Sequence, residues 1–260
     1  MDNFDIEKIY NAMLSAERAG AEIILHKGRI HVHDKSSHRD VVTEYDKKVQ
    51  ELVVNRLKDA VGEARFFCEE NSMQDDLHAE HVFVVDPIDG TMNFVKNFNH
   101  SCISIGYLHN GIPTAAAVYD PYMDEMFSAI KGKGAWLNGT PIHAAKTPLN
   151  ENVFCMGSSP YVQENTDETF RLARIAYDAS LDLRRCASAE LDLAYVAAGR
   201  AGLYFELSLS FWDYAAGMLL VEEAGGKCTT LDSSPLPLDG RKSSILAGGI
   251  QCHNDFAKLI

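Results

Sequence analysis

The sequence lacks a hydrophobic run of the roughly 18 residues needed to cross a bilayer. Its first residues are acidic and lack the basic and apolar regions of a signal peptide. Positive charge is scarce too, because 24 lysines and arginines stand against 37 aspartates and glutamates, for a formal net charge of −13. Such a charge repels nucleic acid and anionic lipid. We therefore expect a cytoplasmic protein that binds neither a membrane nor a nucleic acid polymer.

Cysteine and histidine motifs for metal binding or nucleophilic catalysis are also missing. The six cysteines form no CxxC pair, and the ten histidines include no HExxH spacing. Reduced structural thiols are therefore favoured over zinc ligands or disulfides, and the histidines are expected on the surface. No recognisable phosphatase motif supplies a cysteine or histidine nucleophile, so we expect no covalent phospho-enzyme.

The most informative segment that is present is 86–91, which reads Asp-Pro-Ile-Asp-Gly-Thr and follows the apolar run 82–85. Proline biases the residue before it away from helix, so we expect a strand that ends at Asp86. The amides of Gly90 and Thr91 can open a short helix and hold phosphate oxygens. Two carboxylates beside such amides make physical sense if divalent cations lie between them. The segment predicts metal-assisted phosphate chemistry.

The rest of the chain predicts helices and strands in alternation, without internal repeats. Helical spacing of apolar residues indicates an opening helix of about twenty residues from Ile6, and a second helix follows Asp46. A seam lies near 146–150, and the last long helix begins at Asp213. Between these, strands are expected at 102–108, 112–119, 125–130, 153–156 and 202–206, and helices at 167–177 and 189–198. We expect an α/β (α+β layered) fold with two sub-domains, residues 1–146 and 147–260.

Acidic residues recur where the backbone turns. Glu69 and Glu70 follow a short apolar run, Asp86 and Asp89 follow the next, and Asp213 opens a helix. Alone, Asp213 would be interpreted as a helix cap and the glutamates as a surface pair. Together they gain meaning, because strand-tip carboxylates can meet at one edge of a sheet. Oxygen ligands without histidine or cysteine suit Mg²⁺.

The motifs resemble those of the inositol monophosphatase family. Segment 86–94, Asp-Pro-Ile-Asp-Gly-Thr-Met-Asn-Phe, is similar to the family's DP(I/L)DGTxNF signature. Segment 212–217, Trp-Asp-Tyr-Ala-Ala-Gly, with 222–226 after it, resembles the second signature, WDxAAG…EAGG. Supporting segments occur in the right order at 40–46, 69–70, 131–139 and 204–206. The resemblance spans almost the whole chain, and two signatures in register argue against a chance match.

The resemblance implies an αβαβα sandwich of the sugar-phosphatase type, two to three Mg²⁺ ions and a homodimer. The expected reaction is hydrolysis of a small polyol or sugar phosphate, with inositol monophosphate as the first choice, by in-line attack of a metal-activated water. The family's metal ligands match Glu69, Asp86, the Ile88 carbonyl, Asp89 and Asp213.

The same resemblance assigns reaction and substrate roles. Asp46 and Thr91 match the pair that orients and helps to deprotonate the attacking water, and Glu69 joins them as the residue that contacts a third, weaker ion. Lys35 falls where the family has a mobile lid over the metals. The substrate contacts are expected from Gly90, Thr91, Glu206 and Ala189.

Several positions depart from the family pattern without removing a metal ligand. The stretch 184–191, which the resemblance places near the substrate end of the pocket, has Glu190 where the family has alanine. Glu190 either favours a polyol over a second phosphate or faces solvent, and the residues leave both open. The other departures are Cys68 and Ala187 for glycine, Met92 for threonine and Asn71 for serine.

Other substrates and one other class of function stay open. Relatives on this scaffold act on 3′-phosphoadenosine 5′-phosphate, NADP(H), fructose 1,6-bisphosphate or histidinol phosphate. Met92 and Glu206 resemble the inositol-type members better than the adenosine-phosphate type, which commonly has a lysine after DGT. A non-catalytic metal-binding relative would be free to lose the Asp46–Thr91 pair, which this chain keeps.

Overall fold

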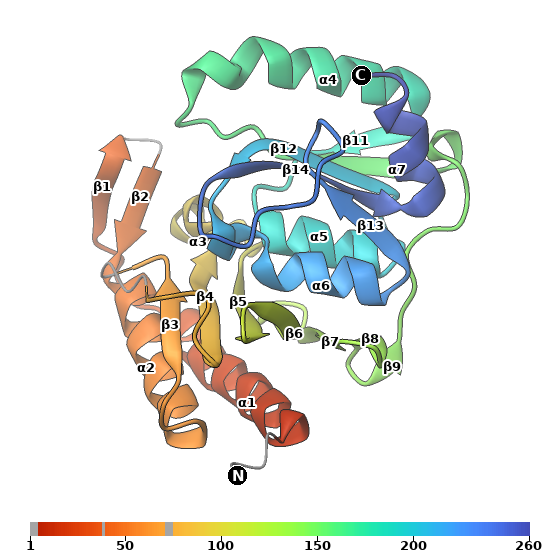
Figure 1. Cartoon of the computed structure of the whole chain (residues 1–260). Coiled ribbons are helices and arrows are strands. Elements are labelled where there is room, and N and C mark those ends of the chain that lie inside the picture. The colour runs from red at the N-terminus through yellow and green to blue at the C-terminus, as the bar shows by residue number, and fades with distance from the viewer. Residues whose placement is uncertain (1–4, 38–39, 71–74) are drawn as a thin grey trace.

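The computed structural model of the chain describes residues 5–37, 40–70 and 75–260. Two large sheets alternate with layers of helices, so that helices cover the outer face of each sheet and further helices lie between the sheets (Figure 1). This arrangement confirms the predicted αβαβα layers. Within the described residues, no helix is both long and apolar enough to span a membrane.

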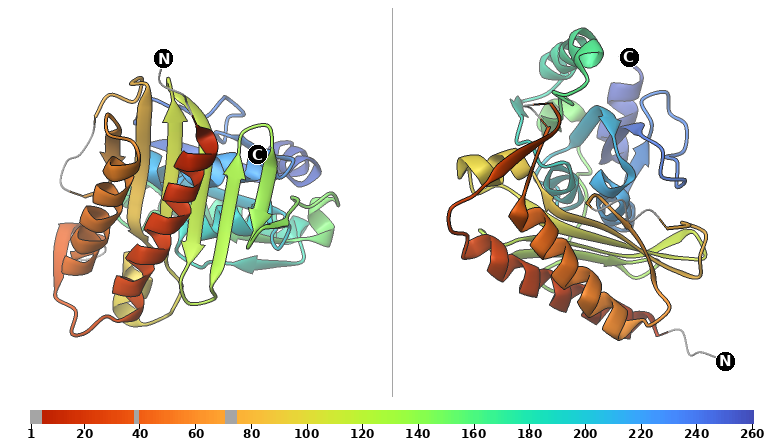
Figure 2. Two further views of the ribbon diagram at one scale, coloured as in Figure 1. Left: turned by 90° about the horizontal axis from the view of Figure 1, so that it is seen from below. Right: turned by 90° about the vertical axis from the view of Figure 1, so that its left-hand side faces the viewer.

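The first layer consists of α1 (Ile6–Leu25) and α2 (Glu44–Ala60), which lie across one face of the larger sheet (Figure 2). α1 has 20 residues, as its spacing predicted. α2 begins before Asp46 and not after it, because the side chains of Thr43 and Asp46 form a capping box at its first turn. Asp46 is thereby fixed at the start of a helix.

The larger sheet has seven strands in the order β3-β4-β5-β6-β7-β8-β9. β3 and β4 are parallel, and every other neighbouring pair is antiparallel. The predicted end of β4 at Asp86 is wrong: after a register shift its pairing with β5 resumes at Asp89, opposite Cys102. The strands are β3 (Arg65–Cys68), β4 (His81–Asp89), β5 (Cys102–His109), β6 (Ile112–Asp120), β7 (Glu125–Ile130), β8 (Gly134–Leu137) and β9 (Thr140–Pro141).

Two small elements flank the end of β4. The short helix α3 (Thr91–Lys96) follows it, as the sequence predicted. A hairpin of β1 (Val32–Ser37) and β2 (Asp40–Thr43) connects α1 to α2, and β2 contacts α3. The hairpin stands apart from the sheet on the same side of the molecule as α3 (Figure 1).

The middle layer consists of α5 (Ala189–Ala197) and α6 (Ala215–Glu223). Nearly all of their side chains are buried, because a sheet covers each side of the pair. The 3₁₀ turn η3 (Phe211–Asp213) precedes α6, so Asp213 ends a turn and does not open the helix as predicted. Ser210 caps that turn through a capping box with Asp213.

The smaller sheet has five strands in the order β11-β10-β12-β14-β13, and α4 and α7 pack on its outer face. His253 on α7 is fully buried, contrary to the expectation that the histidines lie on the surface. The predicted division at 146 and 147 falls between the strands of the two sheets and stays a prediction. The elements are η1 (Leu149–Glu151), β10 (Val153–Met156), η2 (Gln163–Asn165), α4 (Thr166–Ala179), β11 (Asp182–Arg184), β12 (Leu203–Leu209), β13 (Gly226–Thr229), β14 (Ser243–Gly249) and α7 (Ile250–Ala257).

Candidate functional site

Parallel pairing of β3 with β4 brings the first two carboxylates together. Cys68 lies opposite Val85 in the register, so Glu69 and Asp86 are the next residues on neighbouring strands. The amide of Glu69 donates to the carbonyl of Val85 at 3.2 Å, which continues the ladder by one step. Burial raises the pKa of Asp86, and the charges of Glu69 and Asp89 raise it further.

The irregular end of β4 positions Asp89. The amide of Ile88 donates to Oδ1 of Asp86 at 3.0 Å, which closes the turn between the two aspartates. Oδ2 of Asp89 accepts from the Ser188 hydroxyl at 2.6 Å and from the Glu190 amide at 2.7 Å. Asp89 therefore joins the sheet edge to the segment before α5. Burial raises its pKa, although these donors oppose the shift.

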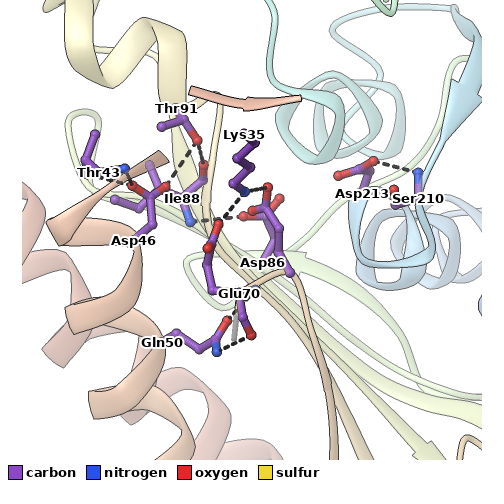
Figure 3. A network of polar contacts seen from close by, with 11 residues as sticks. Lys35, Thr43, Asp46, Gln50, Glu70, Asp86, Ile88, Thr91, Ser210 and Asp213 are labelled. Atoms are coloured by element: carbon purple, nitrogen blue, oxygen red, sulfur yellow. Dashed lines mark hydrogen bonds and ion pairs between the residues drawn. The ribbon is translucent and has the colours of Figure 1, made fainter. Parts of the chain in front are cut away.

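Asp213, from the turn before α6, completes the acidic group in the same pocket. Its Oδ2 accepts from the Ser210 amide at 2.7 Å, which fixes the side chain at the start of η3 (Figure 3). Burial raises the pKa of Asp213, and the charges of Glu69 and Asp89 raise it further. Burial also raises the pKa of Glu69 to about 7. Four neighbouring carboxylates whose pKa values are all raised by burial form a natural site for cations.

Lys35 from β1 neutralises part of this charge. Its Nζ lies 2.7 Å from Oε1 of Glu69. It also forms an ion pair with Glu70 (Figure 3). Burial lowers the pKa of Lys35, but the two carboxylates outweigh that effect and raise it. Gln50 holds the backbone of Glu70 in place, with its amide nitrogen 2.8 Å from the Glu70 carbonyl oxygen. Lys35 of the hairpin thus reaches the acidic residues.

Thr91 and Asp46 form the pair that the sequence predicted. The Thr91 hydroxyl lies 3.2 Å from Oδ1 of Asp46 and 3.1 Å from the Ile88 carbonyl oxygen (Figure 3). Oδ2 of Asp46 accepts from the amide and the hydroxyl of Thr43, at 2.8 and 2.6 Å. Burial raises the pKa of Asp46. A carboxylate held this way is suited to accept a proton through Thr91.

These residues surround a pocket of about 600 Å³. Its floor includes Gly90, whose φ of 87° lies in the left-handed region that favours glycine. A Cβ at Gly90 would lie 3.1 Å from the carbonyl oxygens of Ala187 and His100, so the tight turn also needs glycine for space. Every predicted site residue except Asp46, which lies behind Thr91, lines the pocket: Glu69, Asp86, Ile88, Asp89, Gly90, Thr91, Ala189, Glu206 and Asp213.

Glu206 lies at the far side of this pocket and is held by three donors. Its Oε1 accepts from the amide and the hydroxyl of Ser159, at 2.7 and 2.8 Å, and its Oε2 accepts from the Tyr204 hydroxyl at 2.7 Å. A Cβ on Gly157 would lie 1.7 Å from Oε2, so glycine makes room for the carboxylate. A carboxylate has about four acceptor positions, which leaves about one for a ligand hydroxyl.

The sequence did not assign Arg185, Tyr161 or Asp192 to the site, although all three line the pocket. Arg185 is exposed and donates to the Ser158 hydroxyl at 2.8 Å. It belongs to the stretch 184–191 that the family resemblance placed near the substrate, and that was the available signal. Arg185 is a cationic side chain at the pocket rim.

Both interpretations of Glu190 are wrong, since it neither lines the pocket nor faces solvent. Glu190 is fully buried, and its carboxylate accepts from the amides of Gly217 and Ala216 at 2.6 and 3.2 Å. It therefore caps the first turn of α6 from the neighbouring helix. Burial raises its pKa to about 8. Of the other departures, Met92 lines the pocket, Cys68 is buried in the core, and Asn71 lies outside the described residues.

The donor set fits Mg²⁺. The potential ligand atoms are carboxylate oxygens from the residue after β3, from β4 and from η3, with the Ile88 carbonyl beside them. Hard oxygen donors of this kind are the ones that Mg²⁺ prefers, and its charge would offset the repulsion that raises the pKa of Asp86 and Asp213. The site could therefore hold the ion that the resemblance implies.

Comparisons with known proteins agree with this geometry. A model of the inositol monophosphatase family matches residues 5–260. Inositol monophosphatase 1 from Solanum lycopersicum is 37% identical over 244 residues, which cover 86% of this chain and 85% of that protein. Nus factor SuhB from Xylella fastidiosa is 35% identical over 259 residues, which cover 96% of this chain and 93% of that protein.

A solved structure agrees as well. The IMPase/NADP phosphatase complexed with Mg²⁺ and phosphate is 26% identical, with a TM-score of 0.84 over 98% of this chain and 94% of that chain. The family match, the fold and the grouped carboxylates therefore agree with one another, and together they support a phosphatase. The chain belongs to the inositol monophosphatase family.

Proposed function

We propose that this protein is a Mg²⁺-dependent phosphomonoesterase that acts on a small polyol or sugar phosphate, with inositol monophosphate as the first candidate. One observation carries the proposal: four carboxylates from three parts of the chain line one pocket beside the Thr91–Asp46 pair. A non-catalytic relative has no use for a buried base aligned on the pocket. The pocket volume of about 600 Å³ suits a ligand the size of a sugar phosphate.

Two to three Mg²⁺ ions would be held by Glu69, Asp86, Asp89, Asp213 and the Ile88 carbonyl. When bound, Mg²⁺ would supply Lewis-acid stabilisation of the phosphate charge and activation of water. The chain has a net charge of −13 and would by itself repel an anionic substrate. Bound Mg²⁺ ions would make the pocket locally positive and so attract the phosphate.

The chain's own residues then position the substrate and move one proton. The amides of Gly90 and Thr91, at the start of α3, face the phosphate oxygens. The Thr91 hydroxyl orients the attacking water and passes its proton to Oδ1 of Asp46. Ala189 borders the substrate, and Glu206, with Arg185 beside it at the rim, receives the substrate hydroxyls. The water attacks phosphorus in line with the ester oxygen that leaves, without a phospho-enzyme.

The relatives support this chemistry. One is named an inositol monophosphatase, and the IMPase/NADP phosphatase structure contains Mg²⁺ and phosphate. The relative named Nus factor SuhB shows that this scaffold also occurs in proteins named for another role. The acidic charge of the chain disfavours a nucleic acid polymer as its partner. A homodimer in the cytoplasm belongs to the same proposal.

A substrate panel with matched variants tests the proposal. Phosphate release is measured with and without Mg²⁺ on inositol 1-phosphate, 3′-phosphoadenosine 5′-phosphate, NADP⁺, fructose 1,6-bisphosphate and histidinol phosphate, and kcat/KM ranks them. We expect Mg²⁺-dependent release with the highest kcat/KM on inositol 1-phosphate. Asp213→Asn and Asp89→Asn should each lower kcat by several orders of magnitude while circular dichroism stays unchanged.

Surface acids provide the control for these variants. Asp178→Asn, on the exposed face of α4, should retain wild-type activity, because its carboxylate pairs with Arg174 on the surface and does not line the pocket. Near-normal turnover in well-folded Asp213→Asn would contradict the metal assignment. A protein that releases phosphate from no member of the panel, with or without Mg²⁺, would contradict the enzymatic function itself.

A further inference from the structure

Three side chains that the proposed reaction does not use converge at one edge of the pocket. His100 lies in the turn before β5, Cys186 lies between β11 and α5, and Asp192 lies on α5. One potential ligand atom from each, a ring nitrogen, a sulfur and a carboxylate oxygen, lies within 4.8 Å of the other two. The residues come from segments up to 92 positions apart in the sequence, so no short spacing motif indicates that they form a cluster.

Two of these side chains leave buried polar atoms without a partner. Asp192 is only 1% exposed, and its Oδ1 makes no hydrogen bond within the described residues. The same holds for Nε2 of His100 in the described part of the chain. A buried polar atom without a partner destabilises the folded state, so two of them at one place need an explanation. A bound cation would satisfy both.

The backbone that carries the cluster is fixed by Asn93. Its side-chain amide donates to the His100 carbonyl at 2.8 Å and to the Cys186 carbonyl at 2.7 Å, so one residue ties the two segments together. The next residue, Ala187, has a φ of 67°, in the left-handed region where non-glycine residues are strained. On the far side, the Cys155 thiol hydrogen-bonds to the Asp192 carboxylate. The three ligands are therefore held in place by neighbouring groups, as metal ligands usually are.

The chemistry of the cluster differs from that of the acidic residues. Imidazole, thiolate and carboxylate together form the ligand set of Zn²⁺, whereas Mg²⁺ takes oxygen ligands only. Bond lengths of about 2.0–2.3 Å in a tetrahedral site separate ligand atoms by roughly 3.3–3.7 Å, so a small contraction of the cluster suffices. Asp192 lines the pocket, which gives an ion a path from solvent.

We propose that His100, Cys186 and Asp192 form a binding site for one borderline-soft divalent cation of the Zn²⁺ type. The site is separate from the oxygen-only Mg²⁺ site and stands whether or not the phosphatase proposal holds. A bound ion joins the turn before β5 to the segment before α5. That segment carries Ser188, whose hydroxyl holds Asp89 at 2.6 Å, so the ion also stiffens the wall of the pocket.

Cobalt provides the test, because a thiolate bound to Co²⁺ gives a charge-transfer absorption that oxygen ligands do not give. The full-length protein is kept reduced, saturated with Mg²⁺ to occupy the oxygen-only site, and titrated with Co²⁺ while absorbance and bound metal are measured. We expect one equivalent of Co²⁺ with a thiolate band, displaced by one equivalent of Zn²⁺. Asp192→Asn and His100→Gln should each weaken Co²⁺ binding by at least about tenfold.

Two cysteine variants decide the assignment. Cys186→Ser should remove the thiolate band. Cys228→Ser is the matched control, because Cys228 is also half-buried and lies far along the chain in β13, and its band should equal that of the wild type. A wild-type protein without a thiolate band, or a band of equal strength in Cys186→Ser, would overturn the proposal. If Asp192→Asn fails to fold, the half-buried Cys186 still carries the test.

Discussion

Thr91 stands between a buried carboxylate and the pocket. Its hydroxyl has two acceptors, Oδ1 of Asp46 at 3.2 Å and the Ile88 carbonyl oxygen at 3.1 Å, both fixed by their own elements. Asp46 cannot turn away, because Thr43 donates to its other oxygen twice. The hydroxyl therefore connects the buried Asp46 to the pocket, and removing it should affect the step that activates water.

Thr91→Ala should lower kcat by about a hundredfold or more and leave KM close to the wild-type value, because the lost hydroxyl orients water and does not bind the substrate. Steady-state kinetics on the best substrate of the panel measures both constants. Thr91→Ser keeps a hydroxyl and should retain most of the activity. If KM rises while kcat stays constant, the assigned role is wrong.

The first turn of α6 lies inside the molecule, where water does not reach its free amides. Glu190, from α5, accepts from two of them, the amides of Gly217 and Ala216. Its Oε1 also lies 3.3 Å from the Ser104 hydroxyl, on the face of the larger sheet. One carboxyl group thus connects both middle helices to the sheet, and its contribution is to stability.

Glu190→Ala should lower the free energy of unfolding by about 1–3 kcal/mol, because it leaves two buried amides without an acceptor. The measurement is urea unfolding at pH 4. Burial raises the pKa of Glu190 to about 8, and a glutamate in the unfolded chain has a pKa of about 4.3, so at pH 4 the group is largely protonated in both states and the raised pKa costs little stability. Glu190→Gln retains an oxygen acceptor and should lose less. Equal or higher stability in Glu190→Ala would contradict the capping role.

α7 carries a buried histidine that makes stability depend on pH. His253 accepts or donates one bond, at 2.9 Å between Nε2 and the Thr229 hydroxyl, and burial lowers its pKa to about 4. In the unfolded chain the pKa is near 6.5, so the unfolded state binds more protons between pH 4 and 6.5. The contribution of His253 is therefore present above pH 6.5 and is lost as the pH falls to about 4.

The prediction concerns the slope of stability against pH. Between pH 6.5 and 4, His253→Asn should flatten the loss of unfolding free energy by up to about 1.4 kcal/mol per pH unit, the value for one proton. Urea unfolding at a series of pH values gives the slope for each protein. His33→Asn, on exposed β1, is the control and should keep the wild-type slope. A parallel slope in His253→Asn would refute the idea.

At the scale of the whole molecule, the features that depend on local sequence patterns and motifs could be predicted from the sequence. The order of elements and the positions of Asp86, Asp89 and Asp213 follow from periodicity and from two signatures. Glu190 was misjudged, because a single departure from a family pattern does not reveal which neighbour accepts it. The end of β4 was misplaced, because the register shift depends on its pairing with β5. Long-range contacts decided both cases.

The hairpin of β1 and β2 contributes a positive charge to an acidic group that lies far from it in the sequence. Lys35 comes from this hairpin, yet its ammonium group forms ion pairs with Glu69 and Glu70 at the edge of the larger sheet. Glu69 is also a proposed Mg²⁺ ligand. In the proposed site the lysine and the metal would therefore compete for one carboxylate, and we expect the hairpin to respond to metal binding.

Lys35→Gln should raise the affinity for Mg²⁺ several-fold, because the ion no longer displaces a competing cation from Glu69. The same change should lower the thermal midpoint of the metal-free protein, since Glu69 and Glu70 lose their counter-charge, and added Mg²⁺ should restore more stability than in the wild type. Isothermal titration with Mg²⁺ and thermal unfolding measure the two effects. Lys35→Arg keeps the charge and should resemble the wild type in both. Mg²⁺ affinity that is unchanged or weaker in Lys35→Gln would mean that Lys35 and the metal use different oxygens, and that the hairpin does not respond to metal binding.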